Sequence, residues 1–300
     1  MKTDKTMSKI IKLGARPSRL ALIQADQVKQ QLLAKFPFLS VDIIPIKTEG
    51  DLNQTASLKE LGGKGVFIKE IERKLLDNEI NAAVHSFKDI TATIASETIL
   101  ISFLAPEAIS DSVVITNNHM FKSLQSLPKN SIVATSSLRR KLYLKNYFPH
   151  LKVKDIRGNV ETRINKCKSG FADAVILSKA GLLRLELGSE ITETLPVAEF
   201  VPAPGQGVVT VQTHQNDDLN KYFEAISDPN QQFISILEYL FLKTVGLDCN
   251  YPLGLFIEVK ENKVKIYLKW ASLNMNKLHE KIYECNKEAV TEEIKKIALH

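Results

Sequence analysis

Short runs of β-branched and apolar residues alternate with amphipathic helical segments through the first two-thirds of the 300-residue chain. This alternation constrains the fold more than any other feature, because repeated βαβ units place helices on the faces of mostly parallel sheets. Ligands of such sheets bind beyond the carboxyl ends of the strands. The pattern predicts strands at 9–14, 41–47, 80–86, 111–116, 131–137, 151–157 and 173–179, and helices at 19–36, 66–78, 137–148 and 159–170.

The alternation occurs twice, before and after about residue 106, and then the pattern changes. The two sets predict two doubly wound α/β domains that face a cleft. From about residue 229, a helix at 231–246, strands at 255–260 and 263–273 and a final helix predict a small α+β domain. At about 100–200 residues per domain, the length of the chain accommodates this division.

Composition places the chain among ordinary globular proteins, with 44% hydrophobic and 25% charged residues. Proline or charge interrupts every apolar run well short of the roughly 20 residues that a membrane helix needs. The first ten residues include an acid and have no apolar core, so no secretory signal is expected. The three cysteines are far apart, which predicts neither a disulfide framework nor a zinc site and favours a cytoplasmic location.

The formal net charge of +6 comes from basic and acidic residues that are interleaved along the chain. No aromatic-rich basic motif and no known nucleic-acid-binding signature accompanies this charge. We therefore expect a solvated Lys/Glu surface and no nucleic-acid partner. The histidines and cysteines share no spacing typical of a metal site, so no metal is expected either.

Arginine is rare in this lysine-rich sequence, in which the 40 basic residues comprise 32 Lys and 8 Arg. A guanidinium binds a carboxylate through two parallel hydrogen bonds, which an ammonium cannot do. Because helix N-termini also offer free N–H groups, arginines at strand-to-helix junctions predict a ligand with several carboxylates or phosphates. The alternative is a set of ion pairs on helix surfaces. The arginines at or near such junctions are Arg16, Arg139, Arg140, Arg157, Arg163 and Arg184, with hydroxyl donors at Ser18 and Ser137.

A Lys–Asp pair, Lys88 and Asp89, follows the strand predicted at 80–86. In a cleft, the Asp carboxylate can act as an acid or base or stabilise a developing cation. The alternative for such a pair is a solvated ion pair at a turn. For His85, within the same strand, we expect a hydrogen-bonded structural role.

Two turns complete the candidate site. Gly62, Gly63, Lys64 and Gly65 precede a predicted helix without matching a P-loop, which leaves a mobile lid and a plain flexible turn as interpretations. Cys249 lies in a turn between a helix and a strand, where partial exposure suits a nucleophile or an attachment point. A structural thiol is the alternative at this position.

Taken together and in order, motifs between about Lys9 and Gly254 resemble those of the porphobilinogen deaminase (hydroxymethylbilane synthase) family. They are ARPSRLALIQA, TEGD, GGKGVFIKEIE, AVHSFKD, TSSLRR, RGNVETR, AGLLRLEL, PAPGQG and CNYPLG. The resemblance implies two domains like those of type II periplasmic binding proteins and a smaller third domain. It also implies that a strand starting near Val208 returns to the first domain. The implied domains are 8–105 with 206–226, then 106–205, then 227–300.

The resemblance further implies a chemistry. A dipyrromethane cofactor is expected on Cys249 through a thioether. Four porphobilinogen molecules then add in turn, each losing ammonia, before hydrolysis releases the linear tetrapyrrole hydroxymethylbilane. The expected protein is a cytoplasmic monomer whose partner is porphobilinogen, with no membrane, nucleic-acid or metal partner.

The resemblance also assigns roles to the residues singled out above. Asp89 matches the catalytic aspartate of the family. The residues that match its binders of cofactor carboxylates are Lys88, Ser137, Arg139, Arg140, Arg157 and Arg163. Those that match its substrate binders are Arg16, Ser18, Arg163 and Arg184, and those that match its lid are Gly62, Gly63, Lys64 and Gly65.

Three segments depart from the family's pattern. In place of the R-x-D-P-R-D segment of the family, this chain has PEAISDS, which retains the last acid as Asp111 but has no Arg. In addition, Thr91 stands where the family has the Pro that follows HS-x-KD. Leu247 and Asp248 replace two glycines before Cys249, where an acid tends to raise the pKa of the thiol. A non-catalytic carboxylate-binding bilobal module, of the solute-binding or sensor type, is therefore the alternative to a divergent enzyme.

Overall fold

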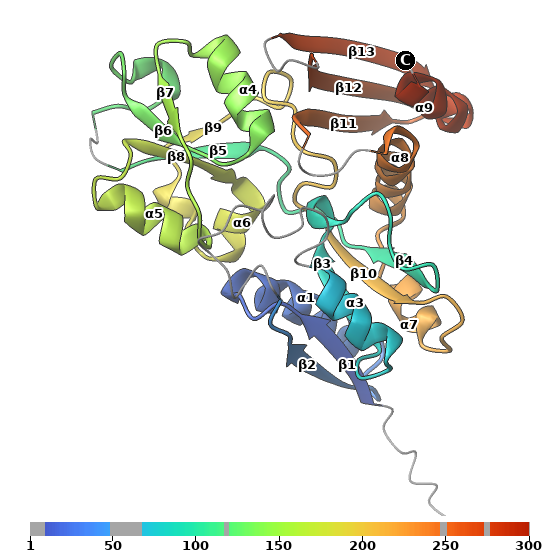
Figure 1. Ribbon diagram of the computed structural model, residues 1–300. Coiled ribbons are helices and arrows are strands. Elements are labelled where there is room, and N and C mark those ends of the chain that lie inside the picture. The colour runs from blue at the N-terminus through green and yellow to red at the C-terminus, as the bar shows by residue number, and fades with distance from the viewer. Residues whose placement is uncertain (1–9, 49–67, 117–119, 247–250, 273–276, 300) are drawn as a thin grey trace, which may run out of the picture.

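Three sheets organise the part of the chain that the structure describes (Figure 1). The computed structural model describes residues 10–48, 68–116, 120–246, 251–272 and 277–299. Two sheets have five strands each and carry helices, and the third has three strands and lies at the C-terminal end of the chain. The predicted architecture of two α/β units and a small α+β unit is confirmed.

The first sheet has the strand order β2-β1-β3-β10-β4. β1 pairs in parallel with β2 and β3, whereas β10 runs antiparallel to β3 and β4. α1 and α7 share one buried cluster with this sheet, and α3 packs on a second cluster that includes Ala83. The elements are β1 (Ile10–Ala15), α1 (Arg19–Lys35), β2 (Ser40–Pro45), α3 (Lys69–Leu76), β3 (Ala82–Ser86), β4 (Thr98–Phe103), β10 (Val209–His214) and α7 (Asn220–Ala225).

The second sheet repeats this arrangement with the order β7-β6-β8-β5-β9. β6 pairs in parallel with β7 and β8, and β5 runs antiparallel to β8 and β9. The elements are β5 (Asp111–Ile115), β6 (Ile132–Ala134), α4 (Leu138–Tyr147), β7 (Lys152–Lys154), α5 (Val160–Lys168), β8 (Ala174–Ser178), α6 (Lys179–Arg184) and β9 (Glu193–Thr194).

The sheets are mixed: four strands of each five-stranded sheet run in the same direction, as expected for mostly parallel sheets, and one strand, β10 or β5, runs against its two neighbours. The antiparallel strands β5 and β10 both follow a segment in which the chain crosses from one unit to the other. Each therefore enters its sheet at the carboxyl ends of the parallel strands and runs back along them. The returning strand expected near Val208 begins at Val209.

The C-terminal unit is an antiparallel sheet of order β11-β12-β13 with α8 and α9 packed on it. Its elements are α8 (Pro229–Val245), β11 (Leu253–Lys260), β12 (Lys263–Ala271), β13 (Leu278–Asn286) and α9 (Val290–Leu299). The strands β4, β9 and β13 were not predicted. β13 reads LHEKIYECN and its residues are exposed or half-buried, so it lacks the regular apolar alternation that marks a strand in a sequence.

Two segments, 104–110 and 195–208, carry the chain between the two α/β units and lie against each other. The amide Nε2 of Gln206 donates to the carbonyl of Ile109 at 2.6 Å. Gly207 has a φ of +89°, and a Cβ at this position would collide with the carbonyl oxygen of Ala108. Glycine meets both requirements, so this residue allows the two crossing segments to touch.

Candidate active site

The candidate residues of the first unit lie at the carboxyl ends of two neighbouring parallel strands. Arg16 and Ser18 follow β1, and Lys88 and Asp89 follow β3. The hydroxyl of Ser18 caps α1 by accepting a hydrogen bond from the backbone N–H of Ala21 at 3.3 Å. Carboxyl ends of adjacent parallel strands meet at one edge of the sheet, so the βαβ pattern accounts for this grouping.

A short 3₁₀ turn, Phe87–Asp89, holds the Lys–Asp pair. Phe87 is buried and packs edge-on against Phe103 with ring centroids 5.2 Å apart. Gly205 from the second crossing segment lies against the Phe87 ring and the backbone N of Lys88, in space that a Cβ would fill. The aromatic anchor and the crossing segment thus fix the turn, while Lys88 and Asp89 stay half-buried.

The second unit presents its candidate residues in the same way. Ser137 follows β6 and caps α4 by accepting from the backbone N–H of Arg140 at 3.4 Å. Arg157 follows β7, and Arg163 lies on α5, where its Nε donates to the carbonyl of Gly158 at 2.7 Å. Both guanidinium side chains are half-buried.

Charged residues of the two units act on one another beside the Lys–Asp turn. Burial lowers the pKa of Lys88, and the cations Arg140 and Arg163 lower it further. Burial likewise lowers the pKa of Arg163 to about 10, with contributions from Arg140 and Arg157. The negative charge of Asp89 opposes both shifts. Since such effects weaken with distance, these residues of the two units lie near one another, and the positive excess favours a polyanionic ligand.

Arg139 and Arg140 are buried, with 4% and 6% of their surface exposed, and both pair with Asp111. Nη2 of Arg139 lies 2.9 Å from Oδ2, and Nη2 of Arg140 lies 2.7 Å from Oδ1. Burial would raise the pKa of Asp111, but the two guanidiniums outweigh it and hold this pKa well below its usual range. The Nη1 atoms donate to the carbonyls of Val201 and Ile176, both at 2.9 Å.

Arg184 is also largely buried. Its Nη2 donates to the carbonyl of Gly207 at 2.7 Å, and its Nε lies 3.7 Å from Oε2 of Glu107 in an ion pair without a hydrogen bond. No described residue accepts from this Nε or from the Nε of Arg140. The predicted arginines therefore fall into two groups. Arg16, Arg157 and Arg163 are half-buried, whereas Arg139, Arg140 and Arg184 are buried.

Some predicted residues fall outside the described ranges. These are Cys249 and the glycine-rich segment Gly62, Gly63, Lys64 and Gly65. His85 has the predicted structural role, since it is 6% exposed and its Nε2 lies 3.1 Å from Oε1 of Gln212. Within the described ranges, no group of three His, Cys, Asp or Glu residues could hold a metal ion, and no helix is long and apolar enough to cross a membrane.

Sequence reasoning missed two polar residues next to this site. Gln206 is 3% exposed, donates to Oδ1 of Asp111 at 3.0 Å and accepts from Nη2 of Arg139 at 3.3 Å. Glu238 is 5% exposed on α8, and its Oε2 accepts from the backbone N–H of Gly205 at 3.0 Å. The available signal for Glu238 was that it is the single acid of its helix and lies at an inward-facing position.

Comparison with known families identifies the family of this chain. A family model described as "Porphobilinogen deaminase, dipyromethane cofactor binding domain" matches residues 11–221. The chain belongs to the porphobilinogen deaminase family. The porphobilinogen deaminase of Wolbachia sp. subsp. Drosophila simulans is 42% identical over 263 residues, which are 87% of each chain. That of Legionella pneumophila is 35% identical over 270 residues, 90% of this chain and 86% of the relative.

Membership in the porphobilinogen deaminase family confirms the predicted activity, that of a hydroxymethylbilane synthase. The family model also confirms the class of cofactor, dipyrromethane. Its attachment through Cys249 and the role of each site residue stay predictions. Among solved structures, the VFT2 domain of Bordetella pertussis BvgS is similar with a TM-score of 0.43 and 16% identity, over 76% of this chain and 92% of that one.

Proposed function

We propose that Asp89 is the catalytic carboxylate with which this chain condenses four porphobilinogen molecules into hydroxymethylbilane. The observation that carries the proposal is that this carboxylate, at the carboxyl end of β3, acts on the charge of Lys88 in its own unit and of Arg163 in the other unit. None of the described residues donates a hydrogen bond to Asp89. The described part of the chain therefore leaves its oxygens to a substrate.

Asp89 would act when the substrate loses ammonia. Positive charge then develops on the pyrrole ring, and a nearby carboxylate stabilises it most strongly where water is excluded. The same carboxylate can accept a proton from the reacting ring. The fixed 3₁₀ turn supports both roles, because it holds Asp89 in place before the substrate arrives.

The cations around Asp89 would bind acetate and propionate groups. Arg157, Arg163 and Lys88 are half-buried and suit direct contact, each charge-assisted bond contributing roughly 1.5–3 kcal/mol. The buried residues Arg139, Arg140 and Arg184 would contribute the donors that Asp111 and the backbone leave unused. Arg16 and Ser18 would bind the incoming substrate, and Ser137 would contact the cofactor beside α4.

The donor set fits a dipyrromethane that carries carboxylates, since the side chains assigned to it are cationic or hydroxylic and the Nε of Arg140 is a buried donor without an acceptor. When bound, this group supplies the covalent primer from which the tetrapyrrole grows. Cys249 would hold it through a thioether, and Gly62, Gly63, Lys64 and Gly65 would form the lid. We further propose that the protein is a cytoplasmic monomer with the domains 8–105 with 206–226, 106–205 and 227–300.

Intact-mass measurement of the purified protein tests the attachment. The expected result is a mass increase equal to two linked pyrroles, which Cys249→Ala abolishes. Cys285→Ala is the matched control, because this free and half-buried thiol on β13 should leave the increase unchanged. An unmodified and inactive wild-type protein after incubation with porphobilinogen would instead favour a non-catalytic carboxylate-binding module.

Steady-state turnover of an Asp89→Asn variant tests the catalytic role. The variant should keep the cofactor mass but lose about 100-fold or more in turnover, because the amide can neither neutralise the developing cation nor accept the proton. Asp26→Asn, on α1, is the control and should be fully active. Undiminished turnover of Asp89→Asn would remove Asp89 from the mechanism.

A further inference from the structure

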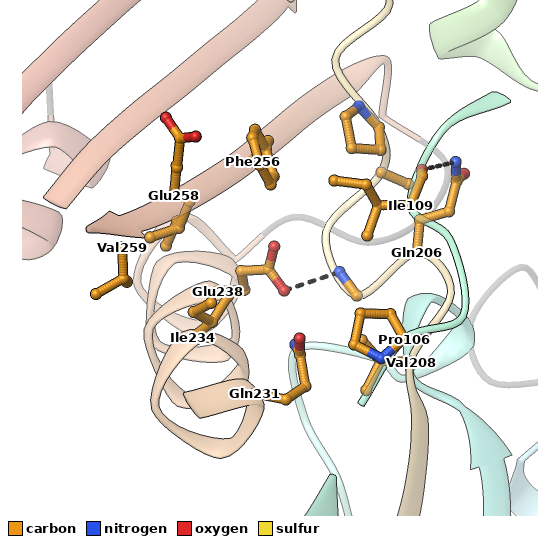
Figure 2. Close-up of a pocket in the computed structure, with 14 residues that line it drawn as sticks. Pro106, Ile109, Gln206, Val208, Gln231, Ile234, Glu238, Phe256, Glu258 and Val259 are labelled. Carbon is orange, nitrogen blue, oxygen red and sulfur yellow. Dashed lines mark hydrogen bonds between the residues drawn. The ribbon is translucent and has the colours of Figure 1, made fainter. Parts of the chain in front are cut away.

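A cavity of about 250 Å³ lies where the three units meet, on the side of the crossing segments that faces the C-terminal unit (Figure 2). Both crossing segments, α8 and β11 contribute to its wall. None of the candidate active-site residues lines it. The lining residues are Pro106, Ile109, Pro202, Ala203, Gly205, Gln206, Val208, Gln231, Ile234, Glu238, Phe256, Ile257, Glu258 and Val259.

A buried carboxyl group, that of Glu238, lines this cavity. Glu238 is 5% exposed, and its Oε2 accepts one hydrogen bond, from the backbone N–H of Gly205 at 3.0 Å. Figure 2 shows this bond, with the second oxygen directed away from it. No described residue donates to Oε1 or forms an ion pair with Glu238. Burial without a cation raises the pKa of this carboxyl to about 8, and the Gly205 N–H opposes the shift only in part.

The rest of the described lining offers no positive charge to Glu238. The other ionisable group in the wall is Glu258 on β11, which pairs with Lys260 at 2.9 Å. The amide Nε2 of Gln206 is already used, because it donates to the carbonyl of Ile109 and to Asp111. Ile234 and Phe256 make much of the remaining wall apolar. The cavity therefore combines an incompletely bonded acid with apolar surface, and the described residues supply no counter-ion.

We propose that this cavity is a binding site for a small alkylguanidinium cation, with the charged head on the Glu238 carboxylate and the alkyl part against Ile234 and Phe256. A planar guanidinium matches a carboxylate through two parallel hydrogen bonds and gives up its hydration more readily than an ammonium does. Oε1 is free to accept one of these bonds, and Oε2 has a second lone pair for the other. The site lies outside the candidate active site and is independent of the function proposed above.

The site is connected to the Lys–Asp turn through one residue. Gly205 donates to Glu238 on one side and lies against Phe87 and the backbone N of Lys88 on the other. A cation on Glu238 therefore acts on the crossing segment that supports this turn. Since Glu238 is mostly protonated at neutral pH, binding must also release a proton.

Isothermal titration calorimetry of the full-length protein with ethylguanidinium tests the proposal. Ethylurea is the matched probe, because it has nearly the same shape and no charge. Ethylguanidinium should bind at least about tenfold more tightly than ethylurea, and its association constant should rise close to tenfold from pH 6 to pH 7 and level off above about pH 8. Buffers of different ionisation enthalpy should report the release of nearly one proton at pH 6.5.

Two variants locate the binding. Glu238→Gln keeps an acceptor for Gly205 but should lose at least about tenfold in affinity together with the pH dependence. Ile234→Trp keeps the carboxyl and should lose binding by filling the cavity. Glu193→Gln is the control, because Glu193 is a half-buried carboxyl that also accepts from a backbone N–H, at Leu124, and it should bind like the wild type. No binding to the wild type, equal binding of ethylurea, or unchanged binding by Glu238→Gln would each overturn the proposal.

Discussion

Replacing Asp111 by Asn removes the anion that two buried arginines share. Asp111 is fully buried, and its Oδ1 accepts from Nη2 of Arg140 at 2.7 Å and from Nε2 of Gln206 at 3.0 Å. Its Oδ2 lies 2.9 Å from Nη2 of Arg139. An amide has one acceptor oxygen, so Asp111→Asn must direct its NH2 group toward a donor in either orientation.

The expected cost follows from the charges that remain. Removing one member of a buried ion pair typically costs about 3–5 kcal/mol, because the other charge stays buried without compensation. Here two guanidiniums remain, but each also donates to a backbone carbonyl, Val201 or Ile176. We therefore expect a loss of roughly 3–4 kcal/mol in the free energy of unfolding, a large part of the 5–15 kcal/mol typical of a folded protein.

Urea unfolding at pH 7, followed by far-UV circular dichroism, measures this loss. Asp173→Asn is the matched control, since Asp173 is half-buried and its Oδ2 accepts from the backbone N–H of Ile132 at 2.7 Å. Its amide can keep that bond, so the expected cost is about 1 kcal/mol or less. If Asp111→Asn costs no more than Asp173→Asn, the buried arginines do not depend on Asp111 for their charge balance, and the reasoning fails.

Three further predictions use the same unfolding assay. Burial lowers the pKa of His85 to about 4 from 6.5, so the unfolded chain binds the proton more tightly. Stability should then fall by roughly 3 kcal/mol as the pH drops from 6.5 to 4, and His85→Gln should remove this slope. Burial raises the pKa of Glu238 to about 8 from 4.5, so stability should fall as the pH rises through that window. Above pH 8, the free energy of unfolding of Glu238→Gln should therefore exceed that of the wild type by roughly 3–5 kcal/mol, and the gain for Glu193→Gln should be clearly smaller. Equal gains for the two variants would contradict the raised pKa of Glu238. Gly207→Ala should lower the free energy of unfolding by roughly 3 kcal/mol or more, because the new Cβ meets a backbone carbonyl at a φ of +89°. Gly170 has a φ of +86° but lies in open space, so Gly170→Ala should lower it by only about 1–2 kcal/mol. Similar losses for the two glycine variants would show that the close contact carries no cost.

The alternating pattern predicted which residues lie at the edge of each sheet, because the ends of strands can be recognised from the local periodicity of hydrophobic residues. Arg16 after β1, Asp89 after β3 and Arg157 after β7 follow directly from strand ends that the sequence marks. The direction in which a strand runs within its sheet does not follow from the local sequence. β5 and β10 run antiparallel because the chain arrives from the other unit, and only contacts between the units determine that. β13 escaped prediction for a different reason, since its residues are exposed or half-buried and its hydrophobic period is weak.

The arginines show the same limit at the level of side chains. The sequence places Arg139, Arg140 and Arg163 at similar junctions, but it does not reveal that Asp111, nearly thirty residues earlier, binds the first two in the core. Burial within the second unit therefore decides which guanidinium groups remain available to a ligand. The spacing of arginines along the sequence does not reveal this burial.

The segment PEAISDS, which departs from the motif of the family, contributes to the wall of the cavity beside Glu238. The residue that this segment keeps, Asp111, is the one that holds two arginines in the core. The residue that stands where the motif begins with Arg is Pro106, which lines the cavity and brings no charge to it. Because neither this residue nor another described residue of the wall brings a positive charge, Glu238 has no counter-ion among the described residues, and burial raises its pKa.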